Sequence, residues 1–148
     1  GAGQLIVADT NILVYAHRGD SEWHGPARSA IQSLAEGRVS WGLPWACVHE
    51  FLAIVTHPRI YEPPSTIVEA TEQVEAWLES PVAELLTETG AHWGILRQQL
   101  ETGRVRGPMV HDARIAALCL DHGATEFWTA DRDFGRFPNL KTRNPLQS

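Results

Sequence analysis

The sequence lacks several features that would place it in other protein classes. It has only two cysteines, Cys47 and Cys119, and no apolar run approaches the roughly 20 residues that a bilayer-spanning helix needs. Each cysteine stands singly in an apolar helical pattern, and two such cysteines cannot make a zinc site without histidines at ligand spacing, so we predict free, buried thiols rather than a disulfide. A glycine-rich phosphate loop is also absent. With no secretory signal in view either, we expect a cytoplasmic protein without a membrane segment.

Basic residues are scarce, and the formal net charge is −6. A protein that coats nucleic acid nonspecifically is normally basic, so the charge argues against that role. Part of the acidic excess could instead belong to a metal site, where a bound cation reverses the local field. The 148 residues, 43% of them hydrophobic, fit one domain with a real core. We expect a tail with a tag remnant (Gly1-Ala2-Gly3) at residues 1–4 and a single domain at residues 5–148.

Apolar runs and helical patterns alternate along the chain. Strands are expected at residues 5–8, 39–43, 82–86 and 126–129, with an edge strand at 140–142. Helices are expected between them, at residues 10–16, 21–37 with Ser21 as the N-cap, 44–57, 67–78, 91–101 and 107–123. This alternation predicts an α/β fold with a small, mostly parallel central sheet.

Two aspartates directly follow predicted strands. Asp9 comes after Leu5-Ile6-Val7-Ala8, and Asp131 follows the strand that ends near Thr129. Ligand sites in open parallel sheets lie beyond the carboxyl ends of the strands, so both acids are expected at the edge where chemistry takes place. Each alone could equally be an N-cap or the first residue of an Asx turn.

Two further acids lie on apolar faces of predicted helices. Glu50 shares a face with Ala46 and Cys47, and Asp112 shares one with Ile115. We expect both carboxylates to point inward, where an unpaired charge must be neutralised, paired or bound to a metal. The alternative is an ion pair with an arginine, such as Arg114 or Arg59.

Together the four acids predict a metal site. At 5 Å and an effective dielectric of 20, each ionised pair repels by about 3 kcal/mol, which only a compensating cation would sustain. Oxygen ligands select Mg²⁺ or Mn²⁺ over zinc. The predicted chemistry is metal-assisted hydrolysis of a phosphodiester.

Four ordered motifs resemble those of PIN domains, and most closely the VapC toxins of VapBC toxin–antitoxin modules. They are Asp9-Thr10-Asn11 after the first strand, Glu50 in an apolar helix, Val110-His111-Asp112-Ala113, and Thr129-Ala130-Asp131-Arg132-Asp133-Phe134. The resemblance runs from about Leu5 to Leu140. It implies a three-layer α/β/α sandwich.

The resemblance also implies roles. Asp9, Glu50, Asp112 and Asp131 would be the catalytic, metal-binding acids, and Asp133 an auxiliary ligand. Asn11 and Thr129 would orient the acids or their waters. The implied activity is that of an Mg²⁺- or Mn²⁺-dependent endoribonuclease on structured RNA, often tRNA or rRNA. Homodimers are implied too, with a VapB antitoxin whose C-terminal segment enters the active-site groove.

Other functions fit parts of the pattern. One is a catalytically inactive PIN-like module that binds RNA or a protein, although the complete set of acids argues against it. Another is an Mg²⁺-dependent phosphohydrolase of small phosphate esters. A zinc-protease helix is excluded, because His49-Glu50 would need a histidine where Ala53 stands. His111 is expected to be a packing or surface residue rather than a general base.

Overall fold

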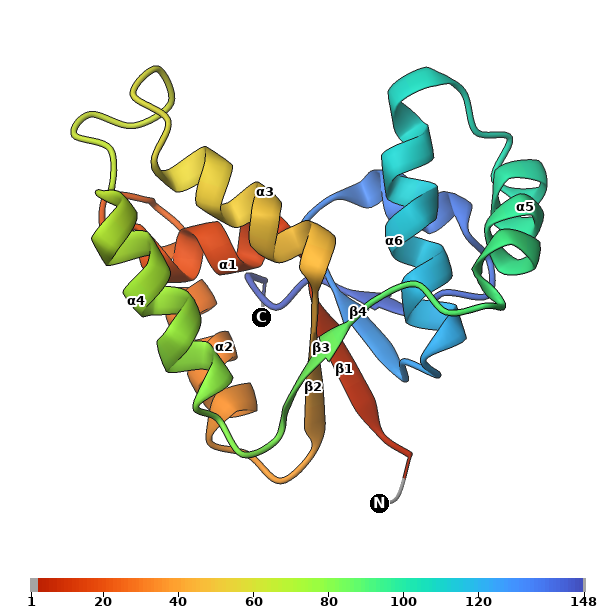
Figure 1. Ribbon diagram of the computed structural model, residues 1–148, viewed down its shortest axis with the longest axis horizontal. Helices are drawn as coiled ribbons and strands as arrows, with labels where there is room; N and C mark the ends of the chain where they lie inside the picture. The colour runs from red at the N-terminus through yellow and green to blue at the C-terminus, as the bar shows by residue number, and fades with distance from the viewer. Residues whose placement is uncertain (1–2, 148) are drawn as a thin grey trace.

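The computed structural model describes residues 3–147, which form a central sheet with helices on both faces (Figure 1). Gly1 and Ala2, in the predicted tag remnant, and Ser148 lie outside the described residues. The strands are β1 (Leu5–Ala8), β2 (Ser40–Pro44), β3 (Ala83–Leu86), β4 (Glu126–Trp128) and β5 (Thr142–Arg143). The α-helices are α1 (Thr10–His17), α2 (His24–Ala35), α3 (Trp45–Val55), α4 (Ile67–Leu78), α5 (His92–Thr102) and α6 (Val110–Asp121). Among residues 3–147, none of the helices has the length and hydropathy to cross a membrane.

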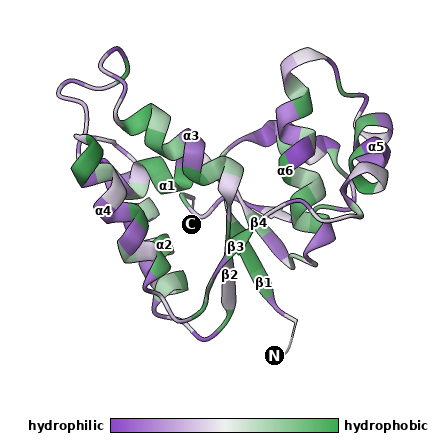
Figure 2. Ribbon diagram, in the orientation of Figure 1, coloured by the Kyte–Doolittle hydropathy of each residue, from purple (hydrophilic) through white to green (hydrophobic). Residues whose placement is uncertain are grey.

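The sheet has the order β3-β2-β1-β4-β5, and every pair of neighbouring strands is parallel. β1 occupies the centre, with Val7 aligned to Gly42 of β2 on one side and to Phe127 of β4 on the other. A central parallel strand is covered on both faces, which explains the continuous apolar sequence of β1. Figure 2 shows this strand in green, the colour of hydrophobic residues. The predicted α/β fold with a mostly parallel sheet is confirmed.

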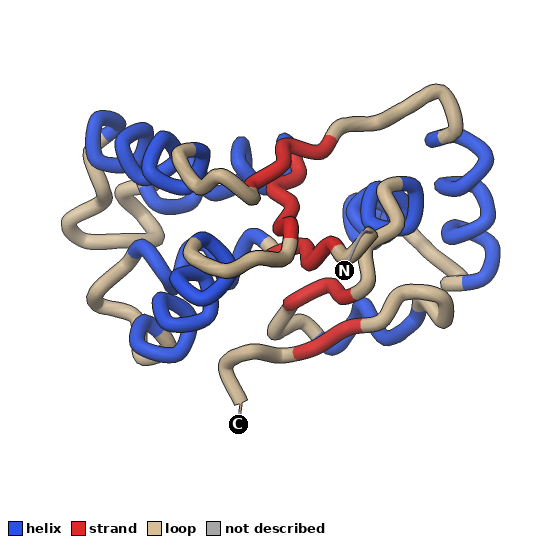
Figure 3. The backbone as a smooth tube through the Cα atoms, turned by 90° about the horizontal axis from the view of Figure 1, so that it is seen from below, coloured by secondary structure: helices blue, strands red, loops and turns tan. Residues whose placement is uncertain are grey.

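Helices cover the sheet in two separate layers (Figures 1 and 3). Helices α1 to α4 lie on one face, where Ala8, Trp41 and Leu43 pack among their buried side chains. Helices α5 and α6 lie on the other face, where Val7 and Phe127 pack against buried side chains of α6. The predicted three-layer α/β/α sandwich is therefore confirmed.

The path of the chain creates a switch point beside β1. From β1 the chain proceeds outward through β2 to β3, and then crosses back to pair β4 with the opposite side of β1. The connections that follow β1 and β4 leave toward opposite faces of the sheet, which opens a crevice at their carboxyl ends. Asp9 and Asp131 are located at these two ends.

Most predicted elements form close to their expected bounds, with two local corrections. Helix α2 begins at His24, so the prediction that Ser21 is its N-cap was wrong; the Ser21 hydroxyl accepts a hydrogen bond from the Trp23 amide in the preceding turn (3.1 Å). The edge strand lies at Thr142–Arg143 rather than at 140–142. Both differences concern short segments, whose bounds depend on tertiary contacts more than on local pattern.

Candidate metal centre

Asp9 is fixed at the end of β1 by hydrogen bonds to both of its carboxylate oxygens. It is the N-cap of α1: its Oδ1 accepts from the Thr10 amide at 2.8 Å, and its Oδ2 accepts from the Thr129 hydroxyl at 2.7 Å. The residue is only 8% exposed. Burial raises the pKa of Asp9 to about 6; its hydrogen bonds to Thr129 and Thr10 oppose the rise, and the charges of Glu50 and Asp131 add to it. The N-cap and site interpretations of Asp9 are thus compatible, because the capping carboxylate also borders the other acids.

Asp131 occupies the equivalent place after β4. It is the N-cap of a short 3₁₀ helix at Arg132–Arg136, and its Oδ1 accepts a hydrogen bond from the Asp133 amide at 2.9 Å. The backbone N–H of Asp131 donates to the Thr129 hydroxyl at 3.0 Å. Thr129, buried between the two strand ends, therefore links Asp9 to Asp131 directly.

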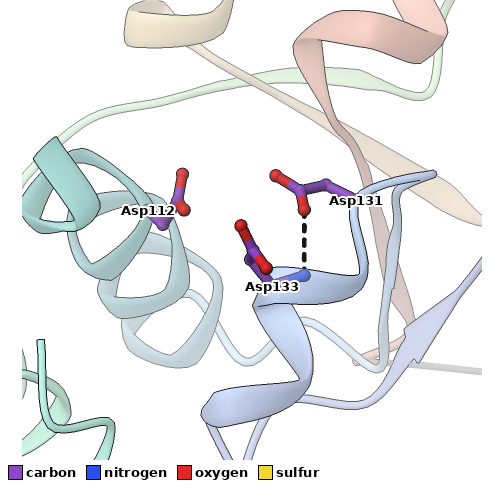
Figure 4. Close-up of side chains that lie close together, drawn as sticks. All are labelled: Asp112, Asp131 and Asp133. Atoms are coloured by element: carbon purple, nitrogen blue, oxygen red, sulfur yellow. Dashed lines mark hydrogen bonds between the residues drawn. The ribbon is translucent and has the colours of Figure 1, made fainter.

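Asp112 completes a compact cluster from the other layer. It lies in the first turn of α6, and one carboxylate oxygen from each of Asp112, Asp131 and Asp133 lies within 4.8 Å of the others (Figure 4). The pKa of Asp112 is raised by burial first and then by the charges of Asp131 and Asp133, while Arg136 lowers it. Three carboxylates at this spacing offer oxygen ligands to one cation.

Glu50 lines a cavity of about 190 Å³ whose walls also include Asp9 and Asp112. The prediction that its side chain points into the interior was wrong: Glu50 is exposed. Its neighbours Ala46 and Cys47 also line this cavity, although Cys47 is buried and packs in the core, so the apolar face of α3 continues past the core to the rim where Glu50 is exposed. The Glu50 charge still raises the pKa values of Asp9 and Asp112. We call Asp9, Glu50, Asp112, Asp131 and Asp133 the acidic site.

No acid of the acidic site forms an ion pair within residues 3–147, although the Arg136 charge lowers the pKa of Asp112. The ion pairs in this part of the chain are Arg18–Asp20, Arg97–Glu101, Arg114–Glu88 and Lys141–Glu126, and none involves an acid of the site. The alternative that Arg114 or Arg59 pairs with Glu50 or Asp112 is therefore wrong for the described residues. A divalent cation would supply the missing positive charge.

The donors present fit a hard cation. All five side chains of the acidic site are carboxylates, whose oxygens suit Mg²⁺ and Mn²⁺. The Cys47 thiol also lines the cavity, but burial raises its pKa to about 12, so it stays protonated and is a poor ligand for a soft metal. The residues therefore fit an oxygen-liganded ion rather than zinc.

Of the two residues predicted to orient the acids or their waters, one contacts the acids and the other does not. Thr129 contacts Asp9 and Asp131 as described, whereas Asn11 is exposed on α1 and its side chain makes no hydrogen bond within residues 3–147. The cavity walls also include His49, His111 and Arg114, of which the sequence indicated no role for Arg114 beyond an ion pair. The sequence carried no signal for Arg114 at this site, because residues two apart on a helix do not share a face.

Comparisons with known proteins agree with this geometry. The family model described as "PIN domain" matches residues 6–140. The chain is 35% identical to VapC ribonuclease Mb2897 of Mycobacterium bovis, over 96% of each chain. It is 31% identical to Ribonuclease VapC37 of Mycobacterium tuberculosis, over 95% of this chain and 97% of the relative.

Solved structures of similar fold include two from toxin systems. VapBC2 from Rickettsia felis, crystallised with a DNA fragment from its promoter, matches with a TM-score of 0.67 and 20% identity, over 95% of this chain and 98% of that one. Mycobacterium tuberculosis VapC20, described as a sarcin-ricin loop cleaving toxin, matches with a TM-score of 0.64 and 17% identity, over 88% and 92%. At these identities the two structures support the fold alone.

Proposed function

Since this chain belongs to the PIN domain family and is related to VapC ribonucleases, we propose that it is an endoribonuclease that hydrolyses RNA phosphodiester bonds. Its biological role in this proposal is that of the toxin of a toxin–antitoxin system. In this proposal residues 5–148 act as a single domain, and Mg²⁺ or Mn²⁺ is held by the acidic site. Asp9, Asp112 and Asp131 would be the principal ligands, with Glu50 and Asp133 completing the set.

One observation carries the proposal. The oxygens of Asp112, Asp131 and Asp133 converge within 4.8 Å at the switch point of the sheet, and no cationic side chain of residues 3–147 forms an ion pair with them. Such a cluster is unfavourable unless a cation binds it. A small-ester phosphohydrolase would share the metal chemistry, but the relatives favour RNA.

The protein's own contribution is to fix the acids before the substrate arrives. A bound divalent cation would lower the pKa of a water molecule and neutralise charge on the phosphate. Thr129 and the Thr10 amide hold both oxygens of Asp9, so its orientation is set without the substrate. The Asp133 amide holds Oδ1 of Asp131 and leaves Oδ2 for a ligand. Glu50 is exposed and lines the same cavity, so an RNA backbone that enters the cavity would meet this carboxylate.

The test is cleavage of total tRNA and rRNA by the purified protein with Mn²⁺ or Mg²⁺. Cleavage should stop with EDTA and in Asp9→Asn, and should persist in Asp121→Asn, a matched control at the far end of α6. RNA binding without cleavage would support the inactive module instead. Turnover of a small phosphate ester, with RNA left intact, would support the phosphohydrolase.

Partners follow from the same proposal. We propose a VapB-type antitoxin whose C-terminal segment covers the acidic site, a homodimer, and action in the cytoplasm, where tRNA and rRNA are available. Solved VapBC complexes from Rickettsia felis and Haemophilus influenzae support an antitoxin partner by analogy of fold. Co-purification with the product of the neighbouring gene would test the antitoxin. Light scattering would test the dimer.

A further inference from the structure

The cavity of about 190 Å³ beside the acidic site, here called the acidic cavity, also has a basic residue, Arg114, in its wall. The cavity collects carboxylates from the end of β1, from α3 and from α6, and Arg114 is the one arginine among its lining residues. An RNA chain that brings a phosphate to the acidic site must pass this wall, and its other phosphates would be repelled by any carboxylate that no cation neutralises. A guanidinium at this place would offset that repulsion.

The hydrogen bonds of Arg114 leave its outer nitrogens available. Its Nε donates to Oε1 of Glu88, and within residues 3–147 neither Nη1 nor Nη2 has a protein partner. The side chain is 44% exposed. Hydrogen bonding to Arg114 lowers the pKa of Glu88, so this carboxylate stays ionised at neutral pH. Glu88 thus holds the guanidinium by one edge and leaves the other for a phosphate, which arginine binds through paired N–H groups.

The pair is not the only link between this loop and α6. The Thr89 hydroxyl donates to Oδ2 of Asp121 at 2.6 Å, and Nε2 of His122 donates to the Thr87 carbonyl at 2.8 Å. Both bonds attach the segment after β3 to the carboxyl end of α6. The position of Arg114 at the cavity wall is therefore not explained by attachment of the loop alone.

We propose that Arg114, oriented by Glu88, binds an RNA phosphate at the mouth of the acidic cavity. The proposal rests on the ribonuclease function proposed above and names a phosphate-binding residue for it. An arginine that contacts one phosphate releases about one counterion, so its loss makes the salt dependence of single-strand binding shallower by about 0.7 in log–log slope.

The test measures binding apart from cleavage. Fluorescein-labelled oligouridylate is titrated by anisotropy with Asp9→Asn protein in Ca²⁺, between about 50 and 200 mM NaCl. Adding Arg114→Met should weaken binding about tenfold at the lower salt and reduce the slope by about 0.7. Arg114→Lys keeps the charge and should restore the slope, while affinity stays lower because lysine lacks the fork that Glu88 holds.

Arg97→Met is the matched control. Arg97 also donates from Nε to a glutamate, Glu101, but it is exposed on α5 and does not line the cavity. Its loss should leave the slope unchanged. Equal slopes for Arg114→Met and Arg97→Met would overturn the proposal, and cleavage by the unaltered protein would show that the ribonuclease function still stands. If the unaltered protein neither binds nor cuts RNA, both proposals fail.

Discussion

The Thr129 hydroxyl donates a 2.7 Å hydrogen bond to Oδ2 of Asp9, a residue 120 positions earlier in the chain. The same hydroxyl accepts a hydrogen bond from the Asp131 amide at 3.0 Å. One buried side chain therefore fixes the relative placement of the acids that follow β1 and β4. Because these strands are neighbours only through the crossover, the site forms only when the sheet is complete.

We expect Thr129→Val to lower the free energy of unfolding by about 1–3 kcal/mol, because Asp9 and the Asp131 amide both lose a buried partner. It should also raise the pKa of Asp9, since the lost hydrogen bond lowers it. Urea unfolding and the pH dependence of Mn²⁺ binding measure the two effects. Thr129→Ser should recover both, and exposed Thr142→Val should change stability by less than about 0.5 kcal/mol. Unchanged stability of Thr129→Val would mean that the bond has no net effect.

In the metal-free protein, the contribution of Asp9 to stability should be lost as the pH rises from about 4 to about 6. The pKa of Asp9 is about 6 in the folded protein and near 3.8 in an unfolded chain, so in this range the native state binds more protons than the unfolded state. The stabilisation is present below the lower pKa and is lost as pH passes the higher one. The difference amounts to about 3 kcal/mol.

The measurement is urea unfolding in EDTA at a series of pH values, for the unaltered protein and for Asp9→Asn. Subtracting the two curves removes the carboxylates whose pKa is lowered on folding, such as Glu88, which contribute with the opposite sign. The free energy of unfolding of the unaltered protein should fall relative to that of Asp9→Asn as the pH increases. Parallel curves would contradict a raised pKa at Asp9.

Asp112→Asn should abolish RNA cleavage while the protein stays folded. In EDTA its melting temperature should equal or exceed that of the unaltered protein, because burial, and then repulsion by Asp131 and Asp133, disfavours the Asp112 charge and raises its pKa. We expect the cleavage rate to fall at least about a hundredfold, the effect of roughly 3 kcal/mol in the barrier. Asp121→Asn, on the same helix, serves as the control. Cleavage by Asp112→Asn at the unaltered rate would make Asp112 a structural residue.

Gly42→Ala should destabilise the sheet beneath the site. A Cβ at Gly42 would lie 2.7 Å from Cδ1 of Leu86 and 3.1 Å from Cγ2 of Val7, in a buried layer that cannot easily shift. We expect a loss of about 1–3 kcal/mol by chemical denaturation. Gly25→Ala on α2, where an added Cβ meets nothing within 4 Å, should be neutral or stabilising. Equal effects of the two substitutions would contradict close packing at Gly42.

The sequence was sufficient to predict the helices and strands and the order of the acids along them. It was less sufficient to predict the direction in which side chains point. Asp9 and Asp131 could be located at a sheet edge, because a buried strand followed by an acid has few alternatives in a parallel sheet. Glu50 could not be oriented: helical phase gives a face, but only tertiary packing decides whether that face meets side chains or a cavity. The same applies to Asn11, which lies two residues after Asp9 yet is exposed.

Polar contacts between residues far apart in the chain could not be predicted from the sequence either. The bond from Nε of Arg114 to Glu88 joins α6 to the loop after β3, and no local pattern indicates it. Arg114, two residues after Asp112, was the alternative partner for that acid, but it pairs with Glu88 and leaves the acids without an ion pair among residues 3–147. The absence of that pairing among the described residues is what favours a metal.

Binding of Mn²⁺ to the purified protein, measured by isothermal titration calorimetry, tests the acidic site most directly. We predict saturable binding that Asp131→Asn weakens at least about tenfold and that Asp121→Asn leaves unchanged. When the ion is at 100 times its dissociation constant, the unfolding free energy of the unaltered protein should rise by about 2.7 kcal/mol. No binding, or equal binding by the unaltered protein and Asp131→Asn, would contradict the account.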